Sequence, residues 1–192
     1  MTAAQADLAR ARSDFPDHRD NPANSRKLRL ERPEVKDGAA CWRIARDSKT
    51  LDLNSSYSYL LWCRDFAGTS VVARLDDGGA DAEPVGFITG YIRPERPRTL
   101  LIWQVAVDES QRGRGLAGAM LDELTSRVAH RDGLTTLETT ISPDNKASQR
   151  LFTSFAERHG ASVDREVLFA ADQFPDGGHE PEVLYHIGPL SF

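Results

Sequence analysis

The chain has 192 residues, of which 40% are hydrophobic and 28% are charged, and its formal net charge is −5 at pH 7. This composition is typical of a soluble globular protein, and the length suits one domain with its own core. The acidic balance argues against a nucleic-acid-binding protein, which gathers Lys and Arg on one face. No apolar run approaches the ~18–20 residues of a membrane span. Residues 1–10 also lack the apolar core of a signal peptide, so we expect a cytoplasmic protein that does not enter membranes.

The first 25 residues differ in character from the rest of the chain. They are polar and charged, they contain Pro16 and Pro22, and they show no sustained apolar period. Such a segment buries too little apolar surface to fold by itself. We therefore expect a disordered or loosely ordered tail over residues 1–25 and a single domain over residues 26–192.

Within the domain, the sequence predicts elements in the order β-α-α-β-β-β-α-β-α-β-β. Alternating apolar residues predict the first strand at Lys27–Glu31, and Asp37 is placed to cap the helix after it. In chain order, the predicted elements are a strand over 27–31, a helix over 38–47, a short helix after the Asn54-Ser55-Ser56 turn, strands over 70–75, 84–93 and 99–107, a long helix from 116 that Gly133 ends, a strand over 134–141, a helix from 145 to about 159, and strands over 162–169 and 183–187.

The connections between these elements predict the fold class. Strands separated by a helix tend to pair in parallel, whereas strands joined by a hairpin pair antiparallel. Pro84–Arg93 and Thr99–Val107 are typical of a hairpin, with Pro94–Pro97 as a longer turn. The order therefore predicts an α+β fold in which helices flank a mixed sheet.

The link between the strand that ends at Val107 and the long helix is the most informative stretch. Apolar residues recur every four positions from Leu116 to Val128, which predicts one buried helix face. The first amides of a helix lack intrahelical partners and, with the helix dipole, favour a bound phosphate. The spacing is that of neither the dinucleotide fingerprint nor the P-loop.

Residues of this link suit an anion. Gly113 and Gly115 let the backbone approach a ligand, because no Cβ stands in the way. Arg112 and Arg114 carry charges that can reach phosphate oxygens. An ordinary strand-to-helix turn with a solvated tip is the alternative interpretation.

The segment Arg112-x-x-Gly115-x-Ala117 resembles the pyrophosphate loop, Q/R-x-x-G-x-G/A, of the GNAT N-acetyltransferases, which bind acetyl-CoA. The predicted order of elements is also the order found in that family. The resemblance implies that Val105 and Val107 bind pantetheine through their backbone and that Asn145 contacts the cofactor arm, unless it simply caps a helix. The loop residues implied in pyrophosphate binding are Arg112, Gly113, Arg114, Gly115, Leu116 and Ala117.

One position departs from the family pattern. Many of these acetyltransferases place a tyrosine seven residues after the asparagine, where it can protonate the leaving thiolate. Here the position within the implied cofactor site is Phe152, which has no proton to give. The donor is then Tyr57, His179 or a water, or the thiolate leaves unassisted.

Three segments resemble one member family, the L-2,4-diaminobutyrate acetyltransferases of ectoine biosynthesis. They are Leu51–Cys63, Trp103–Asp108 and Pro143–Phe152, and the likeness runs from about Leu28 to Leu190. The resemblance implies acetyl transfer from acetyl-CoA to the 4-amino group of L-2,4-diaminobutyrate. It also implies a homodimer.

A small amino acid with two ammonium groups needs acidic acceptors at a fixed separation. Asp52 and Glu182 can supply them, and His179 can meet the carboxylate or carry protons. By resemblance, the substrate residues are Asp52, Tyr57, Trp103, His179 and Glu182. Without the resemblance, the alternative interpretations are a helix cap for Asp52, a core residue for Tyr57 and an ordinary strand aromatic for Trp103. For His179 and Glu182 the alternative is a solvated loop.

We expect direct attack of the amine on the thioester in a ternary complex, with Glu182 or Asp52 as the base, alone or through a water. Cys41 and Cys63 lie in partly apolar segments, which favours buried free thiols over an acyl-enzyme nucleophile. No Cys or His pairs have the spacing of metal ligands, so no metal is expected. A GNAT enzyme for another amine and a non-catalytic acetyl-CoA-binding module are the alternatives.

Overall fold

The computed structural model describes residues 27–49, 51–76, 82–175 and 178–192. The tail predicted over residues 1–25 lies outside these ranges. The predicted order of strands and helices is confirmed. The elements are β1 Lys27–Glu31, α1 Gly38–Ser48, α2 Ser56–Asp65, β2 Val71–Asp76, β3 Gly86–Arg93, β4 Arg96–Val107, α3 Leu116–Asp132, β5 Thr136–Ile141, α4 Lys146–Arg158, β6 Ser162–Phe169 and β7 Glu182–Gly188.

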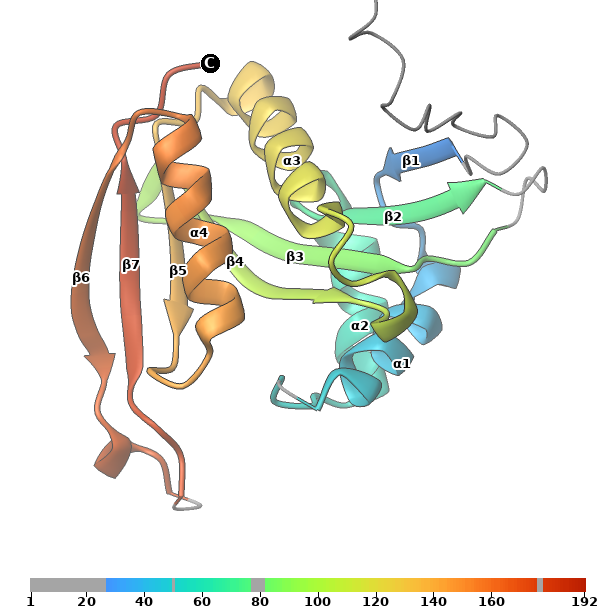
Figure 1. Ribbon diagram of the computed structural model, residues 1–192, viewed down its shortest axis with the longest axis horizontal. Coiled ribbons are helices and arrows are strands. Elements are labelled where there is room, and N and C mark those ends of the chain that lie inside the picture. Colours follow the sequence, from blue (N-terminus) through green and yellow to red (C-terminus); the bar gives the residue numbers. More distant parts are fainter. Residues whose placement is uncertain (1–26, 50, 77–81, 176–177) are drawn as a thin grey trace, which may run out of the picture.

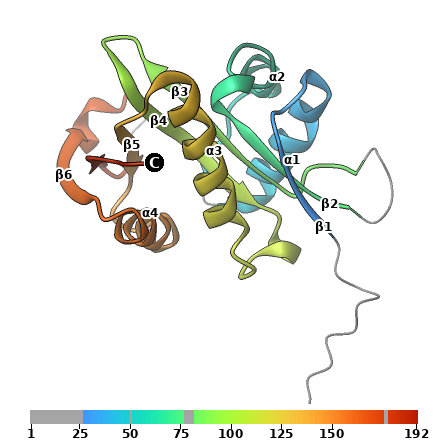
Figure 2. The same cartoon turned by 90° about the horizontal axis from the view of Figure 1, so that it is seen from above.

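The seven strands form one sheet in the order β1-β2-β3-β4-β5-β7-β6. Only β4 and β5 pair in parallel, and the other neighbours are antiparallel, so the predicted mixed sheet is confirmed. Helices α3 and α4 cover one face, and α1 and α2 cover the other face over β2 to β4 (Figures 1 and 2). Within the described residues, no helix is long and apolar enough to cross a membrane.

The buried stripe predicted for the long helix forms the centre of the larger core. Met120, Leu124 and Val128 are fully buried against β-strand residues such as Ile88 and Leu137. This packing fixes the start of α3 beside the end of β4. The loop that joins the two elements is therefore held on a rigid support.

The sheet opens between β4 and β5, the two strands at its centre. β4 pairs with β5 only from Thr99 to Ile102, although β4 continues to Val107. Beyond that point the two strands diverge (Figure 1). The second half of β4 therefore has no strand beside it on the β5 side, and its backbone borders a gap there.

A β-bulge in β4 lies where the two strands part. Gly90 of β3 pairs with Ile102, and Thr89 pairs with Gln104, so Trp103 has no partner on β3. Because side chains alternate along a strand, one extra residue reverses the faces that follow. Ile102 thus packs in the core beneath α3, whereas Ala106 packs in the core beneath α1.

Gly90 allows this bulge. A Cβ at this position would lie 2.6 Å from the carbonyl oxygen of Leu101 and 3.2 Å from that of Thr69, and both are backbone atoms. We expect Gly90→Ala to cost about 1–3 kcal/mol of stability through overpacking, which is a fall in Tm of about 2–12 °C for a domain of this size. Differential scanning fluorimetry measures it.

Gly68→Ala is the matched control for this prediction. The atom nearest to a Cβ there is the end of the flexible Arg131 side chain, which can move aside. Its Tm should stay close to that of the unmodified protein. Equal Tm values for the two variants would contradict the role given to Gly90.

Two local predictions were wrong. The β3–β4 turn is short, because Arg93 pairs with Arg96 and Pro97 lies inside β4, at an irregular register where a missing N–H breaks no regular ladder. Asp37 precedes α1 but does not cap it with its side chain. Its carboxylate instead accepts hydrogen bonds from Arg74 and from the Glu34 amide, both at 2.8 Å, because a buried charge requires a charged partner.

Candidate active site

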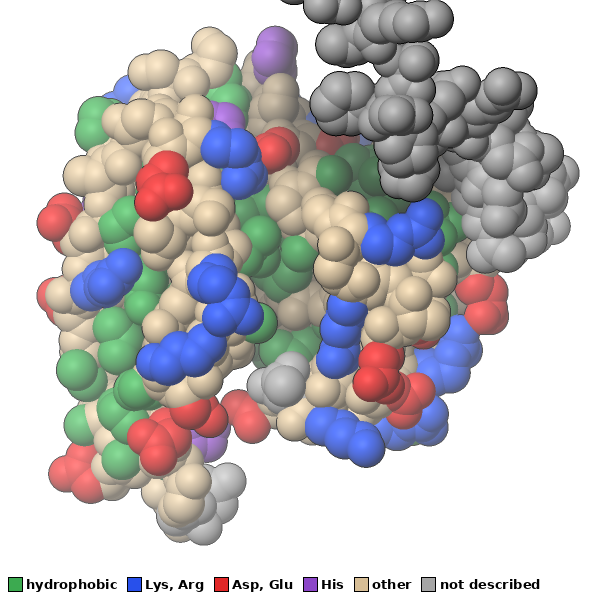
Figure 3. Space-filling model, viewed as in Figure 1, with side chains coloured by type: hydrophobic (Ala, Val, Ile, Leu, Met, Phe, Trp, Pro, Cys, Tyr) green, Lys and Arg blue, Asp and Glu red, His purple; other side chains and the backbone are tan. Residues whose placement is uncertain are grey.

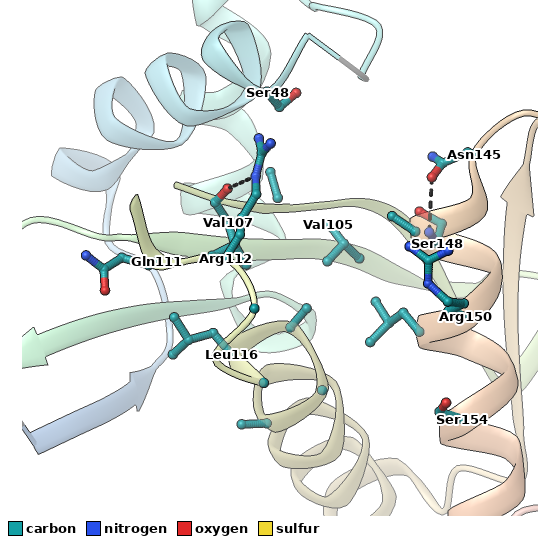
Figure 4. A pocket seen from close by; sticks show the side chains of 18 of the residues that line it. Ser48, Val105, Val107, Gln111, Arg112, Leu116, Asn145, Ser148, Arg150 and Ser154 are labelled. Carbon is teal, nitrogen blue, oxygen red and sulfur yellow. Dashed lines mark hydrogen bonds between the residues drawn. The ribbon is translucent and has the colours of Figure 1, made fainter. Parts of the chain in front are cut away.

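A cleft of ≈ 870 Å³ occupies the gap beside the second half of β4. Its walls are β4, the loop before α3, the start of α3 and the inner side of α4 (Figure 4). The lining residues include Ser48, Leu51, Val105, Ala106, Val107, Gln111, Arg112, Gly113, Gly115, Leu116, Ala117, Asn145, Arg150, Leu151, Ser154 and Arg158.

The loop before α3 has the geometry of an anion site. Gly113 and Gly115 both adopt φ of 76°, and no atom lies within 4 Å of a Cβ built on either. The first amide bonded within α3 is that of Ala119, which donates to the Gly115 carbonyl at 3.0 Å. The amides that precede it have no intrahelical partner, and they gather at the positive end of a 17-residue helix.

Arginine side chains line both walls of this cleft. Arg112 stands by the loop, where its Nε donates to the Val107 carbonyl at 3.2 Å, and Arg150 stands on α4 across the cavity (Figure 4). Arg158 also lines the cleft and is held by Asp122 at 2.8 Å. The surface view shows basic side chains on both sides of the hollow (Figure 3). The cleft therefore suits a polyanionic ligand.

The structure brings most of the predicted cofactor residues to this cleft. Val105 and Val107 line it from β4, and Asn145 lines it while its Oδ1 caps α4 by accepting from the Ser148 amide at 3.0 Å. Arg114 does not line it, because its side chain donates to Gln111. Phe152 is 2% exposed and belongs to the core, so its side chain does not reach the cleft.

Several lining residues were missed at the level of sequence. Arg150, Ser154 and Arg158 follow one another every four residues, a spacing that places them on one face of α4. This polar stripe on α4 could have been used to predict that the helix lines a polar cleft. Ser48 and Leu51 come from the end of α1 and the segment after it, and nothing in the local sequence connects them to the loop.

A second cavity of ≈ 430 Å³ adjoins the cleft, and Leu51 and Asn145 line both. Four of the five predicted substrate residues line it, namely Asp52, Trp103, His179 and Glu182. Tyr57 does not, and its side chain is 65% exposed on α2. The other described lining residues are Asn54, Gln104, Thr140, Ile141, Ser142, Asp144, Gly178 and Glu180.

His179 and Asp52 come from distant parts of the chain and meet at this cavity. The His179 Nε2 lies 3.0 Å from Asp52 Oδ2, its Nδ1 lies 3.0 Å from the Glu180 carbonyl oxygen, and its ring stacks on Phe174. The Glu180 carbonyl and the Asp52 carboxylate raise the pKa of His179, because both favour the protonated ring.

Glu182 begins β7 on the wall of the same cavity. Burial raises the pKa of Glu182, and the charges of Asp52 and Asp144 add to the rise. A hydrogen bond with Thr140 and the charge of His179 oppose it. A carboxyl group with a raised pKa is a stronger base when ionised, so this residue is equipped to take a proton from a bound amine.

Trp103 lines the second cavity from the bulge of β4. As the bulged residue it pairs with neither β3 nor β5, so its backbone groups are outside both ladders. Its indole is 37% exposed and stacks on Trp62 of α2 with ring centroids 4.7 Å apart. Within the described residues, no group of three His, Cys, Asp or Glu is placed to hold a metal ion.

A mixed sheet whose strand leads through a glycine-containing anion loop into a helix is the arrangement that the GNAT resemblance implied. The model of the acetyltransferase (GNAT) family matches residues 38–156, so the chain belongs to that family. The particular group of relatives is narrower. The chain is 64% identical over 191 residues to the L-2,4-diaminobutyric acid acetyltransferase of Streptomyces avermitilis, an alignment that covers 100% of this chain and 99% of the relative.

More distant relatives carry the same name. The L-2,4-diaminobutyric acid acetyltransferase of Marinococcus halophilus is 45% identical, over 84% of this chain and 90% of its own length. A solved structure, the diaminobutyrate acetyltransferase of Paenibacillus lautus in complex with its substrate L-2,4-diaminobutyric acid and coenzyme A, superposes with a TM-score of 0.79 at 40% identity, covering 87% of this chain and 98% of that one. The predicted likeness to the diaminobutyrate acetyltransferases is confirmed.

Proposed function

We propose that the protein transfers the acetyl group of acetyl-CoA to the 4-amino group of L-2,4-diaminobutyrate in ectoine biosynthesis, giving N4-acetyl-L-2,4-diaminobutyrate and CoA. One observation carries the proposal: a basic cleft opens into an acidic cavity beside the bulge of β4. The cleft suits a polyanionic acyl donor, and the carboxylates of Asp52, Asp144, Glu180 and Glu182 suit a diamine. The names of the relatives support this pairing.

In the cleft, the amides at the start of α3 bind the pyrophosphate, and the arginines beside them neutralise its charge. The pantetheine arm runs along Val105 and Val107, in the place where β5 leaves β4 unpaired. This path delivers the thioester next to Trp103. A backbone N–H of β4 can then polarise the thioester carbonyl.

In the cavity, the carboxylates hold the ammonium groups, and Glu182 accepts a proton from the 4-amino group. The freed lone pair attacks the thioester carbon, the carbon–sulfur bond breaks, and the nitrogen releases its second proton to water. CoA leaves as a thiolate that takes its proton from solvent. The core position of Phe152 gives the thiolate no donor there. A thiol pKa of ~8.5 makes an unassisted thiolate an acceptable leaving group, and protonated His179 is the alternative donor.

A thiol-release assay with acetyl-CoA and a series of amines tests this function. We expect release with L-2,4-diaminobutyrate to exceed that with L-ornithine and L-lysine, whose chains are longer by one and two methylenes. A strong preference for another amine would contradict the proposed acceptor. Binding of acetyl-CoA with no thiol release from any amine would identify a non-catalytic binding module instead.

Asp52→Asn is expected to raise KM for L-2,4-diaminobutyrate by about 10–100-fold, because a hydrogen bond to a charged group contributes about 1.5–3 kcal/mol. KM for acetyl-CoA should stay unchanged. Steady-state kinetics with each substrate varied in turn measures both constants. Asp65→Asn is the control, because Asp65 pairs with Arg64 at the exposed end of α2. An equal rise in both KM values would contradict a specific role for Asp52.

The proposal includes a homodimer that works in the cytoplasm. Large hydrophobic side chains are exposed on and beside α2, including Tyr57, Leu60, Phe66 and Trp103, and such a patch supports an interface with a second copy. Light scattering coupled to size-exclusion chromatography tests it. A mass near the 21.3 kDa of one chain would contradict the dimer.

A further inference from the structure

Asp52, which the proposed function places in substrate binding, lies on a segment that packs little against the rest of the fold. It lies between α1 and α2, and its own side chain is 82% exposed, so packing does not fix its position. Its carboxylate nevertheless stands 3.0 Å from His179, a residue 127 positions away along the chain. Something else in the fold must hold this segment in place.

Gln104 provides a tie from the sheet to that segment. Its Nε2 donates a hydrogen bond of 3.0 Å to the backbone carbonyl of Asp52. The Asn54 amide also donates to this carbonyl, at 3.3 Å, but it belongs to the same segment and cannot attach it to anything else. Among the described residues, the Gln104 bond is therefore the hydrogen bond that joins the Asp52 backbone to β4.

Gln104 itself is rigidly placed. It is 5% exposed, it sits next to the bulge, and it pairs with Thr89 of β3. If β4 alternated regularly through Trp103, Gln104 would lie on the same face as Ile102, beneath α3, because alternate residues of a strand share a face. The bulge thus turns the carboxamide towards the segment that carries Asp52.

The surroundings of the carboxamide fix which end faces Asp52. A carbonyl oxygen accepts only from the NH₂ end, which orients the amide. The Oε1 atom and the hydroxyl of Tyr59 are then both buried, and neither makes a hydrogen bond within the part of the chain that the structure describes. Burial raises the pKa of Tyr59, and the nearby amides of Gln104 and Asn54 oppose the rise.

We propose that Gln104 is a positioning residue that holds Asp52 against His179. It thereby shapes the amine-binding end of the second cavity, which we call the acceptor cavity. It acts through Asp52 and does not take part in the chemistry. The inference deepens the proposed function, because it names a residue that sets acceptor affinity.

The test is Gln104→Met, which keeps the length of the side chain and removes the donor. Losing one neutral hydrogen bond, about 0.5–1.5 kcal/mol, should raise KM for L-2,4-diaminobutyrate by about 3–10-fold. KM for acetyl-CoA should not change. Gln104→Glu should raise KM for the diamine further, because it sets an acceptor against the Asp52 carbonyl.

The pKa of His179, measured by NMR titration of histidine-labelled protein, separates this role from a merely structural one. His179→Asn assigns the resonance among the five histidines, and Asp52→Asn gives the value without the carboxylate. In Gln104→Met the pKa of His179 should fall towards that value. Thr89→Val is the control and should leave the pKa of His179 in place. It removes the buried Thr89 hydroxyl, which lies across from Gln104 and makes no hydrogen bond within the described residues.

An unchanged pKa of His179 together with an unchanged KM for the diamine in Gln104→Met would overturn the inference. The same would follow if Thr89→Val shifted both quantities as much. Failure of the unmodified protein to acetylate the diamine would overturn the proposed function instead. The NMR comparison would still decide whether Gln104 holds Asp52.

Discussion

Glu182→Gln is expected to lower kcat by about 100- to 10,000-fold, the range that general base catalysis contributes. The amide keeps the shape of the side chain and cannot accept the proton of the attacking amine. KM for acetyl-CoA should stay unchanged, because Glu182 lines the acceptor cavity and not the cofactor cleft. Steady-state thiol release measures both constants.

The pH profile gives a second readout for Glu182. Burial raises its pKa, and the base works only when ionised, so activity should fall as pH drops through this raised pKa. In Glu182→Gln this acid limb should disappear from the remaining activity. Glu180→Gln removes a charge from the same cavity and should keep the limb. A Glu182→Gln enzyme with near-normal kcat and an intact acid limb would assign the base to another group.

Gly115→Ala is expected to weaken acetyl-CoA binding by about 30–100-fold. Its φ of 76° is strained for any residue with a Cβ, and that Cβ would stand where amides of the loop face the cleft. Losing one or two hydrogen bonds to a charged phosphate costs about 2–3 kcal/mol, which corresponds to this loss of affinity. Isothermal titration calorimetry with acetyl-CoA measures it.

Gly133→Ala separates strain from binding. Gly133 ends α3 at the far side from the loop, also with positive φ and with no atom within 4 Å of a Cβ. Each variant should lose about 1–2 kcal/mol of stability through the left-handed backbone, yet only Gly115→Ala should lose affinity. Equal affinity in the two variants would show that the loop does not hold the phosphates closely.

The sequence made the fold and much of the site predictable because both depend on local patterns. The apolar stripe of α3, the glycines before it and the Asn145 cap are readable from neighbouring residues, and the structure has all three. The resemblance to a family then selected Asp52, His179 and Glu182, which no local pattern connects. The structure brings these three to one cavity.

The features that were missed depend on how distant segments pair. The bulge at Trp103 exists because β4 has one residue more than β3 at this point, and the sequence of neither strand alone shows this difference. Without it, the direction of Gln104 could not be predicted. The prediction that Asp37 caps a helix was wrong because its buried partner, Arg74, lies on β2, and the sequence near Asp37 does not show that contact. Exposure of Tyr57 and burial of Phe152 likewise follow from tertiary packing.

The acidic lining of the acceptor cavity has a consequence for turnover. Acetylation converts one ammonium group of the diamine into a neutral amide, so the product carries one positive charge fewer than the substrate. Carboxylates that attract the two ammonium groups of the incoming diamine hold the product, which has only one, less firmly. The same side chains that gather the acceptor thus favour its exchange after reaction, and accumulating product should compete only weakly with fresh diamine.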